Sequence, residues 1–156
     1  MLPVDAQGVG VIHMSEIANV LYAEAANDPE GWLPKLNVYW MQKKPKESFE
    51  DVVQRVSSAQ KKKSPQYLKA SKGELNEYEK SVYNAIEEAI STFKPDPEWK
   101  YFHHENPEFY ENELDMIKKL QKAWGTNVDF SNRVKIGKEY YFPLKGSHGI
   151  KSLKRE

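Results

Sequence analysis

Apolar residues recur at spacings of three and four along much of this 156-residue chain, and most such runs end at a proline or glycine. This periodicity lines one face of a helix, so it constrains the chain to a largely helical fold. The first run starts after Met14, with Ser15 as the expected N-cap residue, and stops at Asp28-Pro29. The residues on its inner face are Ile17, Val20, Leu21 and Glu24.

The same periodicity predicts further helices over residues 32–40, 48–56, 75–93 and 114–124. Ser48 and Asp51 have the spacing of a capping box, and Gly125 is placed to end the last helix. Residues 99–103 alternate as in a short strand, and residues 133–142 predict a β-hairpin around Gly137-Lys138. The sequence therefore predicts one α+β domain over residues 1–143, predominantly helical, with a small β element near its C-terminal end. Residues 144–156 are basic and offer little to bury, so we expect a mobile tail there.

Charge and residue usage argue against several classes of protein. Lysine plus arginine and aspartate plus glutamate both total 23, so we expect no nucleic-acid partner. The run Lys61–Lys63 is interpreted as an exposed, solvated loop. The chain has no cysteine, no histidine spacing typical of zinc ligands and no glycine-rich phosphate loop, so we expect neither a metal nor a cofactor. His103 and His104 are adjacent, so a strand would direct them to opposite faces.

The sequence contains no apolar run long enough for a membrane span, and its N-terminus lacks the layout of a signal peptide. We therefore expect a protein made in a cytoplasm, without export by that route.

Glu24 stands where a core residue is expected, in the last turn of the first predicted helix. Loss of water at such a position favours the protonated form of a carboxylate, which suits a general acid. The alternative is a glutamate at a helix end that reaches solvent or pairs with a lysine.

Three segments carry a resemblance to a known family: LYAEA at residues 21–25, YFHHENP at 101–107 and RVKIGKEYYF at 133–142. Their order and spacing resemble the SleB-type cell wall hydrolases, which include spore cortex-lytic enzymes and phage lysins, over residues 14–143. The resemblance implies a lysozyme-like fold in which Glu24 matches the essential glutamate of the family. It also implies cleavage of the β-1,4 bond between N-acetylmuramic acid and N-acetylglucosamine in peptidoglycan, in the best-studied members as a lytic transglycosylase.

In that reaction a protonated Glu24 donates to the glycosidic oxygen, and the carboxylate then takes the proton of the C6 hydroxyl, giving a 1,6-anhydro sugar. This route needs a single carboxylate. Ordinary hydrolysis stays open, with Glu30, Asp51 and Glu105 as possible second acids. The resemblance further implies substrate-binding roles for Ser57, Ser58, Tyr101, His103, Asn106, Tyr140 and Tyr141.

Three classes of function remain in competition. The first is a peptidoglycan-cleaving enzyme, which without a signal peptide would act on the cell wall as a phage endolysin or as a lysin carried by the virion. The second is a non-catalytic protein of the virion, or a peptidoglycan-binding protein, that keeps the lysozyme-like fold. Nucleic-acid binding through Lys61–Lys63 is weaker, because the net charge is zero.

Overall fold

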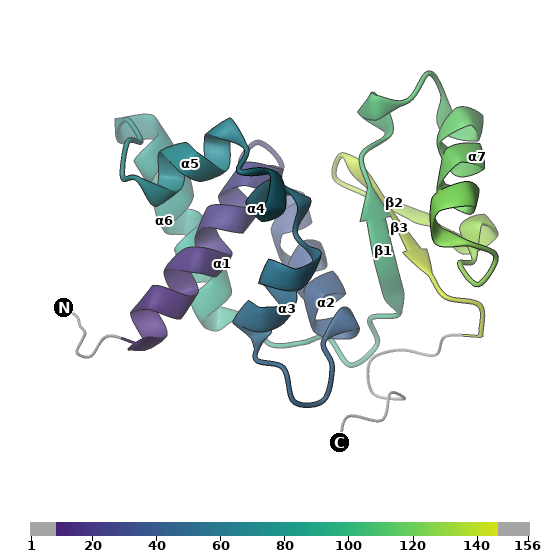
Figure 1. Cartoon of the computed structure of the whole chain (residues 1–156), viewed down its shortest axis with the longest axis horizontal. Helices are drawn as coiled ribbons and strands as arrows, with labels where there is room; N and C mark the ends of the chain where they lie inside the picture. The colour runs from purple at the N-terminus through teal and green to yellow at the C-terminus, as the bar shows by residue number, and fades with distance from the viewer. Residues whose placement is uncertain (1–8, 147–156) are drawn as a thin grey trace.

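The computed structural model describes residues 9–146, with side chains from Glu16 onward (Figure 1). Its α-helices are α1 (Val9–Ala25), α2 (Trp32–Gln42), α3 (Phe49–Val56), α4 (Ser58–Lys62), α5 (Pro65–Ser71), α6 (Glu77–Thr92) and α7 (Glu113–Trp124). Its strands are β1 (Tyr101–Glu105), β2 (Val134–Ile136) and β3 (Glu139–Pro143), and its 3-10 helices are η1 (Pro29–Gly31), η2 (Pro107–Phe109) and η3 (Phe130–Asn132). The prediction of a predominantly helical α+β fold with a small β element near the C-terminal end is confirmed.

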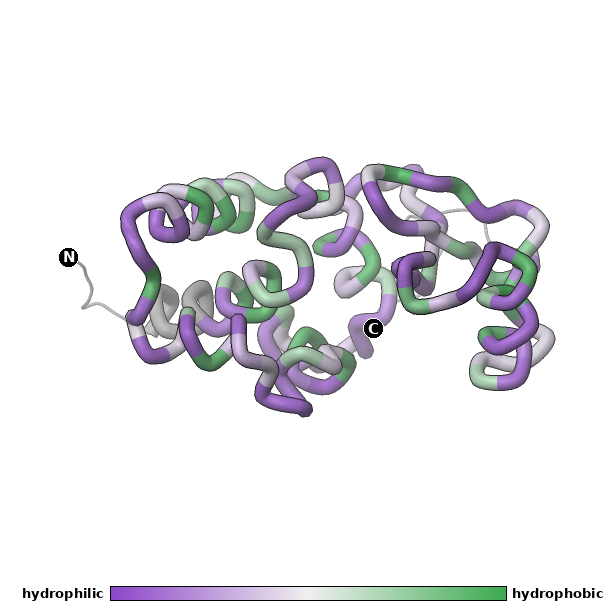
Figure 2. Tube along the Cα trace, turned by 90° about the horizontal axis from the view of Figure 1, so that it is seen from above, coloured by the Kyte–Doolittle hydropathy of each residue, from purple (hydrophilic) through white to green (hydrophobic). Residues whose placement is uncertain are grey.

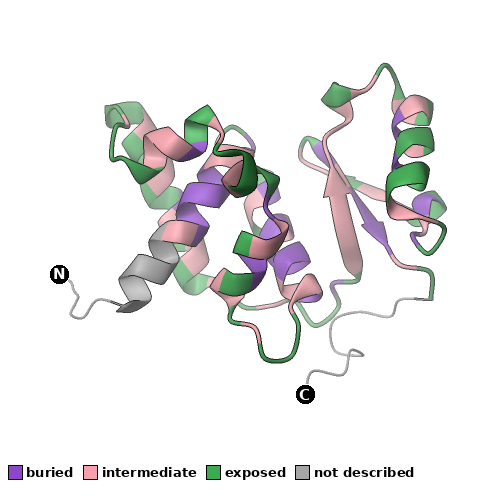
Figure 3. Ribbon diagram, viewed as in Figure 1, coloured by how far each residue is buried: buried purple, intermediate pink, exposed green. Residues whose placement is uncertain are grey.

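Helix α1 forms the centre of a helical part made of α1 to α6. Ile17, Val20 and Leu21 are buried on it, as their spacing predicted, and buried residues concentrate on α1, α2 and β3 in Figure 3. The prediction of an N-cap at Ser15 was wrong, because α1 begins at Val9. Residues 9–14 are largely apolar and contain no proline, so nothing in them stops the helix before Ser15.

Helix boundaries follow local capping signals closely. Ser48 and Asp51 form the predicted capping box at α3, with the Asp51 amide donating to Ser48 Oγ at 3.0 Å. Gly125 ends α7 with a φ of 85°, also as predicted. Leu114 was expected on the apolar face of that helix, but it is 79% exposed. It lies in the first turn of α7, whereas the buried residues of that helix are Met116 and Leu120.

Lys61–Lys63 are exposed, as expected, but they do not form a loop. Lys61 and Lys62 end the short helix α4, and Lys63 caps it in the left-handed conformation with a φ of 51°. Ser57 starts this helix, since its side chain accepts a hydrogen bond from the Gln60 amide at 3.1 Å.

The three strands form an antiparallel sheet in the order β1-β3-β2, and the hairpin turns at Gly137 as predicted. Asp28 fixes this turn to the helical part, because its carboxylate accepts the Lys138 amide at 3.1 Å. Gly137 has a φ of 60°, and a side chain there would collide with the same carboxylate. Strand β1 begins at Tyr101, two residues later than predicted, since the Trp99 amide closes a turn on the Asp96 carbonyl.

The sheet and α7 form a second part that lies beside the helical part along the longest axis of the molecule (Figures 1 and 2). Helix α2 packs against β1, and a core cluster spans the junction. Its buried members are Val38, Met41, Trp99 and Tyr141. The two parts therefore pack directly against each other where α2 meets β1. Elsewhere along the junction, the end of α1 and helix α4 are separated from β1 by a cavity.

Part of the segment expected to be a mobile tail is paired. Leu144 bridges to Val128, and the Lys145 amide donates to the Asn127 carbonyl at 2.9 Å. The remainder of that expected tail, residues 147–156, lies outside the described residues. Within residues 9–146, no helix is both long and apolar enough to span a bilayer.

Candidate functional site

Glu24 is half-buried in the last turn of α1, and two hydroxyls hold its carboxylate. Tyr39 on α2 donates to Oε1 at 2.5 Å, and Ser57, between α3 and α4, donates to Oε2 at 3.4 Å. Both donors come from the core: Tyr39 is 2% exposed and Ser57 is 1% exposed. Three different elements thus fix the orientation of one carboxylate.

Burial and the neighbouring Glu24 carboxylate raise the pKa of Tyr39 well above its usual value. The phenol therefore stays protonated at neutral pH and remains a hydrogen-bond donor to Glu24. Among residues 16–146, no lysine or arginine forms an ion pair with Glu24. The structure therefore does not show the alternative in which this glutamate pairs with a lysine.

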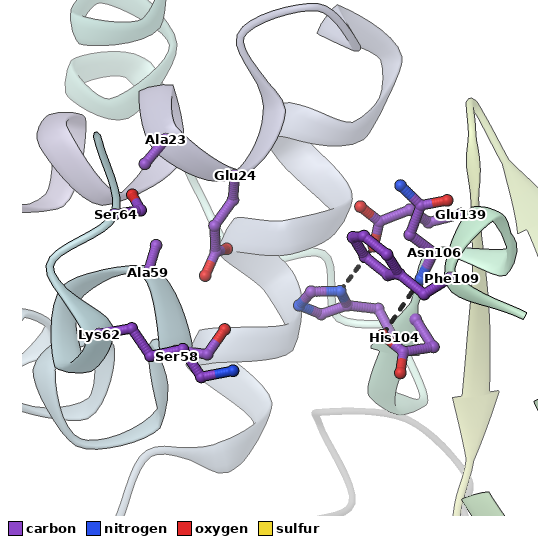
Figure 4. A pocket seen from close by; sticks show the side chains of 11 residues that line it. Ala23, Glu24, Ser58, Ala59, Lys62, Ser64, His104, Asn106, Phe109 and Glu139 are labelled. Atoms are coloured by element: carbon purple, nitrogen blue, oxygen red, sulfur yellow. Dashed lines mark hydrogen bonds and ion pairs between the residues drawn. The ribbon is translucent and has the colours of Figure 1, made fainter. Parts of the chain in front are cut away.

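Two cavities meet at Glu24, and we call them together the cleft. The first, of about 290 Å³, lies between α1 and α4 on one side and β1 with η2 on the other (Figure 4). The second, of about 420 Å³, extends toward α2 and α7. The side chains that line both are Glu24, Ser58, His104 and Glu105. The cleft thus has Glu24 on its helical wall and polar groups of β1 on its opposite wall.

A buried network of charges supports the β1 wall. Glu139 on β3 accepts a hydrogen bond from Nδ1 of His104 at 2.8 Å and pairs with Nζ of Lys35 at 2.8 Å. Burial alone would raise the pKa of Glu139, but the contacts with His104 and Lys35 lower it to about 2. Lys35 is fully buried in α2, and its only other close partner among the described residues is the Tyr141 hydroxyl at 3.5 Å.

Among the possible second acids, only Glu105 lines the cleft. Its Oε2 accepts the Tyr110 hydroxyl at 2.5 Å, and its Oε1 accepts the Asn106 amide at 3.2 Å. Asp51 belongs to the capping box of α3, and Glu30 is exposed in η1; neither lines the two cavities at Glu24.

The structure brings four of the predicted substrate-binding residues to the cleft or to Glu24. Ser58 lines both cavities, Asn106 lines the first, His103 lines the second, and Ser57 contacts Glu24 directly. His103 stacks on Trp124 at 4.3 Å between ring centroids, while burial and the adjacent His104 lower its pKa to about 4. It is therefore neutral at pH 7.

The three tyrosines expected to bind substrate do not line the two cavities at Glu24. Tyr101 packs edge-on against Trp99 at 5.1 Å. Tyr141 is fully buried in the core between the two parts. Tyr140 points to the other face of β3, where its hydroxyl donates to the Glu113 carboxylate. Side chains alternate along β3, so its two tyrosines lie on opposite faces of the sheet, and each is engaged in contacts within the protein.

Sequence reasoning missed Tyr39, His104, Glu139 and Lys35. One signal was available: Lys35 stands between Trp32 and Tyr39 on the inner face of a helix, so it occupies a core position as Glu24 does. A charged residue at such a position calls for a buried partner. No comparable signal in the sequence marks Glu139 or selects His104 over His103.

Residues 16–146 contain no group of three or more histidine, aspartate or glutamate side chains arranged to hold a metal ion. Comparison of the chain with protein-family models, curated proteins and solved structures finds no match. The resemblance to SleB-type cell wall hydrolases accordingly rests on the three short motifs.

Proposed function

We propose that the protein cleaves the glycan strands of peptidoglycan, with Glu24 as the general acid. The observation that supports this most is the setting of Glu24: a half-buried carboxylate, fixed by the hydroxyls of Tyr39 and Ser57, that faces a cleft lined from both parts of the molecule. A carboxylic acid at such a place can protonate the oxygen that leaves a glycosidic bond.

The cleft offers further groups suited to an amino sugar. Ser58 and Asn106 supply a hydroxyl and an amide for hydroxyl and acetamido groups, and the exposed ring of Phe109 offers an apolar surface at the rim. The proposed substrate is the β-1,4 linkage between N-acetylmuramic acid and N-acetylglucosamine, and the proposed place of action is the cell wall, as an endolysin or a virion-borne lysin.

The proposed reaction is a lytic transglycosylation, in which the C6 hydroxyl of the muramic acid closes on its own anomeric carbon. Because Glu105 lines the same cleft, hydrolysis with a second carboxylate is the competing outcome. A non-catalytic peptidoglycan-binding or virion protein is the alternative from a different class.

Clearing of purified sacculi by wild-type protein and by Glu24→Gln tests the proposal. Glutamine keeps the shape and the contacts with Tyr39 but cannot give up a proton, so we expect cleavage to be abolished with an unchanged circular dichroism spectrum. Glu30→Gln makes the same chemical change at an exposed position outside the cleft and should clear sacculi at the wild-type rate.

Mass spectrometry of the products separates the two reactions. Ends of 1,6-anhydro-muramic acid support transglycosylation, whereas reducing ends that take up heavy oxygen from labelled water indicate hydrolysis. Clearing by Glu24→Gln at the wild-type rate would show that Glu24 is not the acid, and binding without any product would favour the non-catalytic alternative.

A further inference from the structure

His104 is the best-supported polar side chain on the β1 wall of the cleft. Its Nδ1 atom lies 2.8 Å from Oε1 of Glu139, and Oε2 of Glu139 lies 2.8 Å from Nζ of the fully buried Lys35. The ring also packs against that of Tyr141 at 5.9 Å between centroids. Such a chain of contacts fixes the orientation of the imidazole before any ligand arrives.

The partner of Nδ1 determines which nitrogen carries the proton of the neutral ring. Glu139 is ionised at neutral pH, because contacts with His104 and Lys35 hold its pKa at about 2 in spite of its burial. An ionised carboxylate can only accept hydrogen bonds, so Nδ1 is the donor. In the neutral imidazole, Nε2 therefore presents a lone pair.

This second nitrogen faces the cleft. Figure 4 shows it on the side of the ring that is turned toward Glu24 and Ser58, away from Glu139. Within the described residues it has no hydrogen-bond partner. The carboxylate oxygens of Glu105, in contrast, already accept the Tyr110 hydroxyl and the Asn106 amide. Of the two residues, His104 is the one whose cleft-facing acceptor atom has no hydrogen-bond partner among the described residues.

We propose that His104, on the wall of the cleft opposite Glu24, is a catalytic residue. Its Nε2 takes the proton of the hydroxyl that attacks the anomeric carbon. This inference rests on the proposed function. Glu24 gives its proton to the glycosidic oxygen as the bond between that oxygen and C1 breaks. The C6 hydroxyl oxygen forms the new bond to C1, and its proton passes to Nε2. The imidazolium, stabilised by Glu139, then returns a proton to Glu24 through solvent, which restores both groups.

Two substitutions separate proton transfer from hydrogen bonding. His104→Asn keeps an amide near the position of Nδ1, where it can still donate to Glu139, but leaves nothing at the position of Nε2. His104→Gln places an amide near the position of Nε2, where it can hydrogen-bond but cannot accept a proton at neutral pH. A base role predicts that both variants lose about 100-fold or more in turnover, while binding to sacculi stays near wild type. Free imidazole should restore turnover to His104→Gly.

Glu105→Gln provides the comparison on the same wall of the cleft, with an expected loss well below that of His104→Asn. Nitrogen NMR supplies a readout that does not depend on activity: the neutral His104 ring should carry its proton on Nδ1. If one of the two His104 variants unfolds, the turnover of the other variant per folded molecule still tests the base role. The NMR measurement on wild-type protein tests it independently.

Several results would overturn the assignment. Wild-type turnover in His104→Gln would show that His104 only forms a hydrogen bond to the substrate and is not a base. A neutral ring with its proton on Nε2 would contradict the assignment of the proton to Nδ1. A larger loss in Glu105→Gln than in His104→Asn would transfer the role to Glu105. If wild-type protein and both His104 variants cleave sacculi equally well, the role of His104 is refuted and the proposed function stands. If wild-type protein does not cleave sacculi, the proposed function and the role of His104 are both refuted.

Discussion

Glu139→Gln should destabilise the protein strongly, because it removes the charge that neutralises a fully buried lysine. Lys35 would keep only the Tyr141 hydroxyl at 3.5 Å, which does not compensate an ammonium group without water. The fall in the pKa of Glu139 from 4.5 to about 2 corresponds to about 3 kcal/mol of folding free energy. Breaking a buried ion pair from one side costs about 3–5 kcal/mol in general, which agrees with this magnitude.

The effect should depend on pH with a defined sign. A carboxyl group whose pKa is lower in the folded state stabilises the protein above its unfolded pKa, and this stabilisation is lost as the pH falls through the folded pKa. For Glu139 the window runs from 4.5 down to about 2. The difference in unfolding free energy between wild type and Glu139→Gln should therefore be about 3 kcal/mol at pH 7 and about 1.5 kcal/mol at pH 3.

Urea unfolding followed by tryptophan fluorescence at pH 7, 5 and 3 measures this difference. The double variant Lys35→Met with Glu139→Gln is the matched control, since it removes both charges and should recover most of the lost stability. If Glu139→Gln is as stable as wild type at pH 7, or if the difference does not shrink at pH 3, the ionised Glu139–Lys35 pair does not exist as described.

Two further predictions concern local contacts. Tyr39→Phe removes the donor at 2.5 Å from Glu24 and should lower turnover on sacculi by about tenfold with little change in circular dichroism, whereas Tyr78→Phe, at a position 76% exposed, should have no effect. Equal activity in the two variants would remove Tyr39 from the site. Ser48→Ala loses the capping box of α3 and should cost about 1 kcal/mol of stability, seen as a fall of about 2–4 °C in melting temperature; an unchanged melting temperature would contradict this.

Local signals were sufficient for most of the secondary structure. The capping box at Ser48, the stop at Gly125 and the turn at Gly137 are each decided by a few neighbouring residues, and all three are confirmed. The start of α1 was missed because Ser15 resembles an N-cap, while a helix continues wherever nothing breaks it.

The sequence also identified the inner face of α1, and with it Glu24, since a charged residue at a core position can be recognised from spacing alone. It could not identify what surrounds that carboxylate. Tyr39 and Ser57 reach it from other elements, and Glu105 was one of three equally plausible acids until the packing of β1 placed it in the cleft.

The residues on the β1 wall of the cleft are set by the register of β1 against β3. No local pattern in the sequence encodes this register. β1 pairs with β3 through an irregularity between Tyr101 and His103, so that His104 stands opposite Tyr141 and faces the helical part, while His103 turns toward α7. Since side chains alternate along a strand, a shift of β1 by one residue would exchange the faces of the two histidines. Spacing along the chain thus identified the carboxylate at a core position, and only the tertiary pairing determined which imidazole contacts Glu139.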